Sequence, residues 1–315
     1  MQELYLGARK VTEEVKKAVV GKDQAIELIM AAVLARGHVL IEDIPGVGKT
    51  TMALAFARAM GIEEKRVQFT PDVLPADLTG FSMYRKETGQ FVYQPGAVMC
   101  NLLLADEINR TSPKTQSALL EVMEERTVTV DGITRKTGEP FTVIATENPE
   151  GSAGTQLLPE SQLDRFMICL SMGYPTVEEE VEILKRRKEG SPVETVTRVL
   201  SGPLVLAMQE AVEQVFIHDA VYRYMAELAK ATRNQELLQA GISPRGTVAL
   251  AAMSRAWAWM SGRGYVIPDD VREVFFSTAG HRIRLSTRAK VSHVKPEDVL
   301  GQVLEEVKAP SARKQ

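Results

Sequence analysis

Cysteine and histidine are scarce in this sequence. Its 315 residues include two cysteines, Cys100 and Cys169, and four histidines that are scattered singly along the chain. These spacings do not match those of metal ligands, so a structural metal site is not expected. Both cysteines lie in apolar, strand-like runs, which predicts buried thiols that stay reduced, as is usual in the cytoplasm.

Long apolar runs and a marked excess of one charge are also missing. No apolar run approaches the ~20 residues needed to span a bilayer, and the N-terminus lacks the apolar core of a signal peptide. The net charge of −3 gives no overall reason to expect nucleic acid or an anionic membrane as a partner. With 44% apolar and 25% charged residues, the composition is that of a globular protein. We expect a cytoplasmic protein without a membrane span.

Up to about residue 172, short apolar runs alternate with helix-like segments. Strands that alternate with helices indicate βαβ units and a parallel sheet that is covered on both faces. The expected strands are 39–41, 66–69, 102–105, 141–145 and 167–170. The expected helices between them are 49–60, 114–125 and roughly 160–166.

The character of the chain changes after Pro175, where the strand-like runs stop. A helix is expected from Thr176 to Gly190, with acidic residues in its first turn and basic residues in its last. Further helical patterns lie at about 203–214, 219–232, 244–261, 268–280 and 296–307. The sequence thus predicts an α/β domain over 1–173, which includes a short N-terminal helix, and a smaller all-helical domain over 174–315.

Two stretches interrupt the α/β plan. Residues 80–99 carry a Thr-Gly pair midway, and residues 126–140 carry Asp131-Gly132 directly after alternating valines. Asp-Gly between alternating residues is a strong signal for a β-hairpin turn. We therefore expect an inserted hairpin in each stretch.

Residues 38–51 are the most informative part of the sequence. Apolar residues run into a Pro/Gly-rich turn that ends in Gly48-Lys49-Thr50, and helix formers follow. In such a loop the backbone N–H groups point at phosphate oxygens, and the helix N-terminus adds a positive dipole end. Lys49 would reach the β- and γ-phosphates, and the Thr50 hydroxyl would bind Mg²⁺. The expected phosphate-loop residues are Pro45, Gly46, Val47, Gly48, Lys49, Thr50 and Thr51.

Asp43 departs from the usual phosphate-loop pattern, which has glycine at this position. Aspartate tolerates turn conformations better than most other residues. The loop therefore keeps its shape if the Asp43 carboxylate faces away from the phosphates.

Two acidic residues follow the apolar strand at 102–105. A buried parallel strand would deliver Asp106 to the same sheet edge as the phosphate loop, which is where ligands bind in such sheets. There Asp106 would hold Mg²⁺ through its water shell, and Glu107 would orient and polarise the attacking water. The strand at 141–145 ends near Asn148, which would reach the γ-phosphate or that water; read alone, its Asn-Pro pair is only a turn signal.

Two arginines are candidates for contacts with phosphate. Arg165 follows a short helix and would stabilise transition-state charge on a neighbouring subunit's nucleotide. Its alternative is an ion pair within the chain, with Asp164 or Glu160. Arg245 opens a helix in the second domain, where it would touch phosphate on its own subunit or on a neighbour.

Taken together, these segments resemble the AAA+ superfamily, and within it the MoxR-type ATPases. The similarity covers most of the chain, and its ordered series of motifs is highly specific. The matching segments are 41–50, 105–110, 114–125, 144–149, 158–166 and 242–245.

The resemblance implies ATP and Mg²⁺ as cofactors and assigns a role to each motif. It makes Lys49 and Thr50 the Walker A residues, and Asp106 and Glu107 the Walker B residues. It makes Asn148 sensor 1, Arg165 the arginine finger and Arg245 sensor 2. Val20 and Gly21 match the segment that lines the adenine pocket. The hairpins resemble the helix-2 insert and the pre-sensor-1 hairpin of these ATPases. Glu147 stands where the family often has glutamine, which places a negative charge near the γ-phosphate.

The leading functional hypothesis is a Mg-dependent ATPase that forms a homo-oligomeric ring, expected to be a hexamer, and remodels a protein client. The resemblance implies a von Willebrand factor A-type partner. One alternative is a nucleic-acid motor, because helicase relatives share both hairpins and residues 126–140 carry Arg126, Arg135 and Lys136; the acidic net charge argues against it. The other is a motor subunit of the magnesium-chelatase type.

Overall fold

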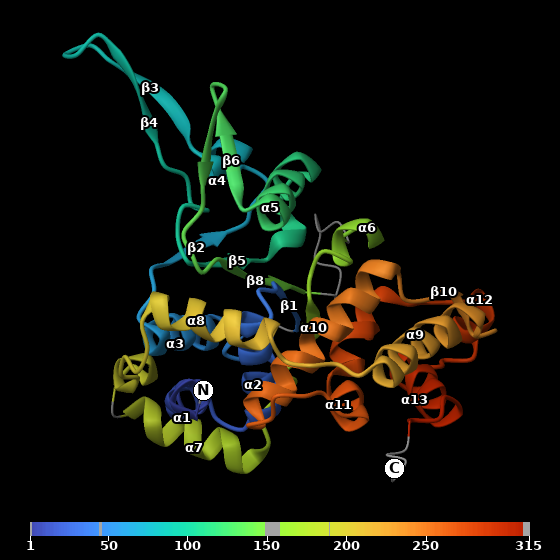
Figure 1. Cartoon of the computed structure of the whole chain (residues 1–315). Coiled ribbons are helices and arrows are strands. Elements are labelled where there is room, and N and C mark those ends of the chain that lie inside the picture. Colours follow the sequence, from blue (N-terminus) through green and yellow to red (C-terminus); the bar gives the residue numbers. More distant parts are fainter. Residues whose placement is uncertain (1, 44–45, 149–157, 189, 311–315) are drawn as a thin grey trace.

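A five-stranded parallel sheet organises the first half of the chain (Figure 1). The computed structural model describes residues 2–43, 46–148, 158–188 and 190–310. The strand order is β2-β5-β8-β1-β9. The strands are β1 (Val39–Glu42), β2 (Glu64–Gln68), β5 (Leu102–Asp106), β8 (Thr142–Glu147) and β9 (Ile168–Leu170). All five predicted strands are therefore confirmed, with ends that differ by at most two residues.

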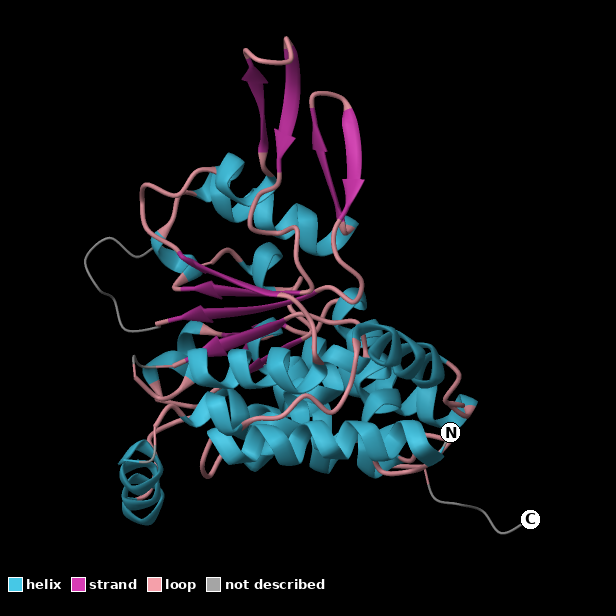
Figure 2. Ribbon diagram, turned by 90° about the vertical axis from the view of Figure 1, so that its left-hand side faces the viewer, coloured by secondary structure: helices cyan, strands magenta, loops and turns pink. Residues whose placement is uncertain are grey.

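Side chains of the sheet alternate between two hydrophobic cores, as the period of two in a strand requires. On one face pack α4 (Pro75–Thr79) and α5 (Pro113–Glu125), and the core there includes Leu40 and Leu103. On the other face lie α1 (Gln2–Ala18), α2 (Asp23–Leu34) and α3 (Lys49–Met60), together with most of the second half of the chain. Figure 2 shows the sheet between these two layers, of which the second is much thicker.

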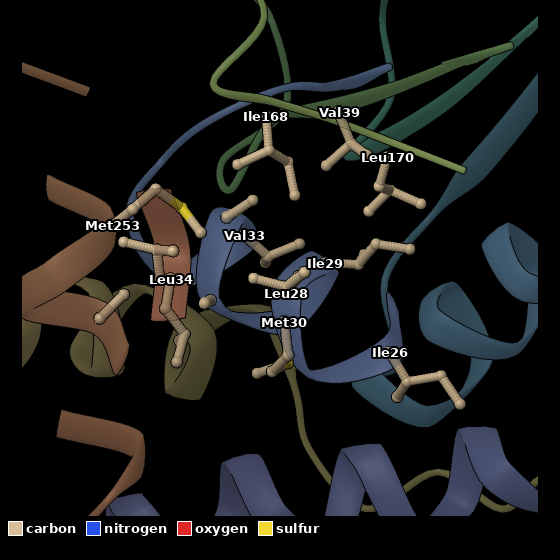
Figure 3. Packing of buried hydrophobic residues seen from close by; sticks show 14 of the residues in the cluster. Ile26, Leu28, Ile29, Met30, Val33, Leu34, Val39, Ile168, Leu170 and Met253 are labelled. Atoms are coloured by element: carbon tan, nitrogen blue, oxygen red, sulfur yellow. The ribbon is translucent and has the colours of Figure 1, made fainter. Parts of the chain in front are cut away.

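Helix α2 is apolar on nearly all sides and lies at the centre of the thicker layer. Figure 3 shows Ile29 and Val33 facing the sheet residues Val39, Ile168 and Leu170, while Leu34 lies beside Met253 of the second half. A helix with this composition is stable only when it is buried on several sides. The sequence predicted only a short N-terminal helix, whereas the structure has two helices there.

The two inserted hairpins are confirmed. One consists of β3 (Phe81–Arg85) and β4 (Gln90–Gln94), and the other of β6 (Thr127–Val130) and β7 (Ile133–Lys136). Both project from the same side of the sheet (Figures 1 and 2). The Arg135 guanidinium lies 4.0 Å from the centre of the Tyr93 ring, so the second hairpin contacts the first.

The second half of the chain is helical, as predicted, with one exception. Strands β10 (Leu238–Ala240) and β11 (Arg284–Leu285) form a small antiparallel sheet, so the prediction that strands stop after Pro175 is wrong for these residues. Such short strands show no alternation that a sequence pattern could reveal. The helices are α6 (Glu160–Leu163), which precedes β9, and then α7 (Val177–Lys188), α8 (Gly202–Glu213), α9 (Asp219–Asn234), α10 (Pro244–Met260), α11 (Pro268–Ala279), α12 (Thr287–Val291) and α13 (Pro296–Glu306).

Short 3₁₀ helices complete the description at η1 (Ile108–Arg110), η2 (Pro192–Thr195) and η3 (Gly280–Arg282). Within the described residues, every helix is too short or too polar to cross a bilayer.

Candidate nucleotide-binding site

The loop between β1 and α3 has the geometry of a phosphate cradle. Gly46 and Gly48 adopt φ values of 90° and 94°, which residues other than glycine rarely adopt. A Cβ atom at Gly46 would meet nothing within 4 Å, so this part of the loop faces open space. Gly48 caps the N-terminus of α3 in the left-handed conformation, and the helix dipole therefore points at this space. The predicted Pro45 lies outside the described residues.

Lys49 is buried at the base of this loop. Its Nζ donates a hydrogen bond of 2.6 Å to the backbone oxygen of Asp43. Burial lowers the pKa of Lys49, while nearby carboxylates, that of Asp43 first, raise it. The ammonium group is therefore already inside the loop, at the place from which it would reach a phosphate.

The carboxylate of Asp43 faces away from the loop interior, as the sequence predicts. Its Oδ2 accepts hydrogen bonds from the backbone N–H groups of Met172 at 2.6 Å and Gly173 at 2.8 Å. The Ser171 hydroxyl donates a third bond of 3.2 Å. Asp43 thus joins the phosphate loop to the connection between β9 and α7, which explains how the loop accommodates a charged residue here.

Asp106 ends β5 at the same edge of the sheet. Its Oδ1 accepts a hydrogen bond of 2.6 Å from the Thr146 hydroxyl. Its Oδ2 accepts a bond of 2.7 Å from Nη2 of Arg66, on the neighbouring strand β2. Carboxylate and hydroxyl oxygens are the ligands that Mg²⁺ prefers, so Asp106 and Thr50 form a donor set that fits this ion.

Glu107 follows Asp106 in the left-handed conformation, with φ of 57°. The backbone N–H of Glu107 donates to the Thr146 hydroxyl at 2.9 Å. Its Oε2 accepts bonds of 2.8 Å from Gln68 of β2 and 2.8 Å from Arg110. Both acidic side chains are therefore held by residues of β2.

Arg66 and Gln68 are site residues that sequence reasoning missed. They stand two positions apart on β2, on one face of the strand, and Gln68 is in register with Asp106. The signal in the sequence is a polar side chain at every second position at the end of an expected strand. It becomes informative only once the strand order places β2 beside β5.

A cavity of about 350 Å³ lies where the phosphate loop, Asp106 and Glu107 meet. Its size suits the polyphosphate part of a nucleotide. Arg66 and Asn148 also line it, and the Asn148 backbone oxygen accepts a bond of 3.1 Å from Asn109. The predicted residues that line it are Gly46, Gly48, Lys49, Thr50, Thr51, Asp106, Glu107 and Asn148.

A second cavity of about 590 Å³ adjoins the first, because Gly46, Gly48 and Thr51 line both. Its other walls come from Ala18 at the end of α1, from Val19 and Val20 directly after it, and from α7 and the segment before it. The predicted Val47 lines this larger cavity as well. The walls are mostly apolar side chains, as a purine base requires.

Gly21 lies between Val20 and Lys22, which both line the larger cavity. It adopts φ of 71°, and a Cβ atom there would lie 1.8 Å from a carboxylate oxygen of Glu179 on α7. Gly21 therefore allows close packing between the N-terminal segment and α7, whereas its neighbour Val20 lines the cavity.

Glu147 ends β8 beside Glu42 of β1, with which it is in register. Only 3% of Glu147 is exposed. Burial, followed by the neighbouring Glu42 carboxyl, raises the pKa of Glu147 to about 8. The side chain is then mostly protonated at neutral pH, so the negative charge that the sequence predicted near the γ-phosphate is largely absent.

Arg165 and Arg245 line neither cavity; both contact Glu124 of α5. Arg165 lies 3.3 Å from Oε2 of Glu124, and Arg245 donates to Oε1. Arg165 thus forms an ion pair within the chain, as the alternative prediction proposed, but its partner is Glu124, whereas Asp164 and Glu160 pair with Arg282 and Arg284. The two arginines lie together, one from each half of the chain.

Comparisons with known proteins identify the family. The model of the ATPase family associated with various cellular activities (AAA) matches residues 38–168, and the AAA lid domain matches residues 230–303. The chaperone MoxR1 of Mycobacterium tuberculosis is 42% identical over 306 residues, which span 94% of this chain and 81% of MoxR1. The chain belongs to the MoxR-type AAA+ ATPases. YeaC of Bacillus subtilis is 46% identical over 304 residues, which span 96% of this chain and 95% of YeaC.

A crystal structure of a candidate ATPase from Cytophaga hutchinsonii has the same fold as this MoxR-type chain. Its TM-score is 0.90 at 33% identity, over 98% of this chain and 97% of that one. The predicted α/β core with a C-terminal lid is thereby confirmed. As a member of this family, the protein binds and hydrolyses ATP, and the two adjoining cavities provide the room for the nucleotide.

Proposed function

We propose that this MoxR-type protein is a Mg-dependent ATPase that works as a homo-oligomeric ring, most simply a hexamer, and remodels protein clients. The proposal rests on the family and on a set of hydrolytic residues that is split between two surfaces of the chain. Lys49, Thr50, Asp106 and Glu107 line the phosphate cavity, whereas Arg165 lies outside it.

The residues of the phosphate cavity have separate roles in ATP hydrolysis. The loop amides and Lys49 bind the β- and γ-phosphates, and Thr50 with Asp106 would hold Mg²⁺, which neutralises phosphate charge when bound. Glu107 orients the attacking water and polarises it. Asn148 lines the same cavity and positions the γ-phosphate or that water.

One observation carries the oligomeric part of the proposal: both candidate arginines are absent from the linings of the chain's own nucleotide cavities. Arg165 and Arg245 instead share the half-exposed Glu124 on the surface of α5. Guanidinium groups on this surface are placed to stabilise transition-state charge on another subunit's nucleotide. We assign both arginines to action in trans.

The partner class follows from relatives and from resemblance. MoxR1, which is similar over most of its length, is described as a chaperone, and we extend that role to this protein. We also propose a von Willebrand factor A-type partner and a cytoplasmic location. We also propose a boundary near residue 173 between the α/β domain and the helical lid domain.

The contacts of the basic residues argue against a nucleic-acid motor. Arg135 stacks on Tyr93 and donates to the Val130 and Ile133 carbonyls of its own hairpin. Arg126 donates to the Arg36 carbonyl. Side chains that are committed to contacts within the chain contribute little to phosphate binding, which requires accessible cations.

Mixing of two inactive variants tests the proposal. Glu107→Gln should bind ATP without turning it over, and Arg165→Ala should be inactive because the trans arginine is missing. A mixture should regain activity, since some interfaces combine an intact Glu107 with an intact Arg165. Each variant mixed with itself is the control, and a mixture that stays as inactive as these controls would refute trans action.

A further inference from the structure

Arg66 occupies the face of Asp106 that a magnesium ion would need. We propose that Arg66 is an electrostatic latch, which competes with the hydrated ion for Oδ2 of Asp106 and is displaced when MgATP binds. The inference rests on the magnesium role proposed for Asp106. Arg66, on the edge strand β2, would thereby control how much Mg²⁺ strengthens nucleotide binding.

The hydrogen bonds of Asp106 explain why the Arg66 guanidinium and a hydrated Mg²⁺ would compete for its carboxylate. Oδ1 is engaged by the Thr146 hydroxyl at 2.6 Å, which also accepts the Glu107 N–H and is thereby fixed. Oδ2 is engaged by Arg66 at 2.7 Å. Metal-bound waters also donate hydrogen bonds to carboxylates, so a hydrated Mg²⁺ at Asp106 would compete with the guanidinium of Arg66 for the acceptor sites of this carboxylate. A guanidinium and a divalent cation at one carboxylate oxygen would also repel each other.

The position of Arg66 allows it to leave. β2 is the edge strand of the sheet, and 49% of the Arg66 side chain is exposed, against 12% for Asp106. Arg66 also donates a longer bond of 3.2 Å to Oε1 of Gln68, and the Gln68 amide donates to Glu107 at 2.8 Å. The hydrogen bonds of Arg66 therefore continue through Gln68 to Glu107, which is also held by Arg110.

The latch has a measurable consequence for the linkage between metal and nucleotide. We define the magnesium factor as the dissociation constant of a non-hydrolysable fluorescent ATP analogue without Mg²⁺, divided by the constant with Mg²⁺. In the wild type, the favourable free energy of interaction between Asp106 and the ion is partly offset by the cost of displacing Arg66. Removal of Arg66 should therefore raise the magnesium factor, whereas the loss of a simple phosphate contact would weaken binding equally in both conditions.

The experiment compares four single variants and one double variant with the wild type by equilibrium binding of this analogue, with excess EDTA or with Mg²⁺. Arg66→Gln should raise the magnesium factor about fivefold, the order expected for a partly exposed ion pair. Arg66→Lys, which keeps the charge, should stay near the wild type. Arg110→Gln is the matched control, because Arg110 pairs with Glu107 in the same region but not with Asp106, and it should change the factor less than twofold.

Asp106→Asn separates a failure of the latch from a failure of the magnesium assignment. It should lower the magnesium factor, and adding Arg66→Gln to it should have no further effect. If Asp106→Asn lowers the factor but Arg66→Gln leaves it unchanged or lowers it, the latch is refuted and the magnesium role stands. A factor that Asp106→Asn does not change would overturn the magnesium role of Asp106, and the latch with it.

Discussion

Glu147 offers a quantitative test of the electrostatics behind the phosphate loop. The unfolded chain should ionise this carboxyl near pH 4.5, whereas burial beside Glu42 raises the pKa to about 8 in the folded protein. Between these values the unfolded state loses a proton that the folded state keeps, so stability falls as the pH rises. Each pKa unit corresponds to about 1.4 kcal/mol, which gives a loss on the order of 4 kcal/mol above pH 8.

Glu147→Gln removes this titration while preserving the shape of the side chain. At pH 5 the variant and the wild type should have similar stability, because the carboxyl is neutral in the folded wild type and the pH is only about half a unit above the unfolded value of 4.5, where the linkage costs less than about 1 kcal/mol. As the pH rises to 8.5, the variant should become the more stable protein, with a melting temperature about 4–8 °C higher. Thermal unfolding of the nucleotide-free protein from pH 5 to 9 measures this gap.

The control is Glu87→Gln, in the exposed turn between β3 and β4. Its melting temperature should follow the wild type at every pH, because the Glu87 side chain is exposed to solvent at the tip of a hairpin that projects from the sheet. A Glu147→Gln gap that is constant with pH, or that opens in favour of the wild type, would refute the assignment of a buried, protonated Glu147.

Three further substitutions test other contacts. Lys49→Ala should weaken binding of a fluorescent ATP analogue by about 10-fold or more, because a charge-assisted bond to phosphate is lost; unchanged affinity would exclude Lys49 from the site. Asp43→Ala removes the acceptor of three hydrogen bonds and should lower the free energy of unfolding in urea by roughly 2–4 kcal/mol, and a loss below about 0.5 kcal/mol would contradict this. Arg282→Ala leaves the Asp164 carboxylate without its guanidinium and should lower the free energy of unfolding by roughly 3–5 kcal/mol. The control Arg284→Ala, at an exposed pair, should lower it by about 1 kcal/mol or less. Equal losses in the two variants would argue against the buried pair.

The sequence predicts well those features that depend on neighbouring residues. Helix α3 begins and ends as predicted, because Gly48 and Gly61 take left-handed conformations on either side of it. The buried strands are recognisable as short apolar runs, and the phosphate loop is encoded in consecutive residues. Local chemistry was therefore enough to predict the α/β plan and most of the phosphate cavity.

Features that depend on distant neighbours were not predicted. Helix α2 has no polar face, so its sequence lacks the period that marks an amphipathic helix. The contact of Arg66 with Asp106 requires β2 to lie beside β5, and the contact of Arg165 and Arg245 with Glu124 requires the two halves of the chain to meet at α5. These contacts depend on the tertiary arrangement, so no local sequence motif predicts them.

The larger cavity is walled by three segments that lie far apart in the chain: the end of α1, the phosphate loop, and α7 with its flanks. An adenine nucleotide bound there would join the N-terminal segment to α7, and at 100 times its dissociation constant it would add about 2.7 kcal/mol to the stability of the folded state. ATP would then be both the substrate of this enzyme and a contributor to its folded stability.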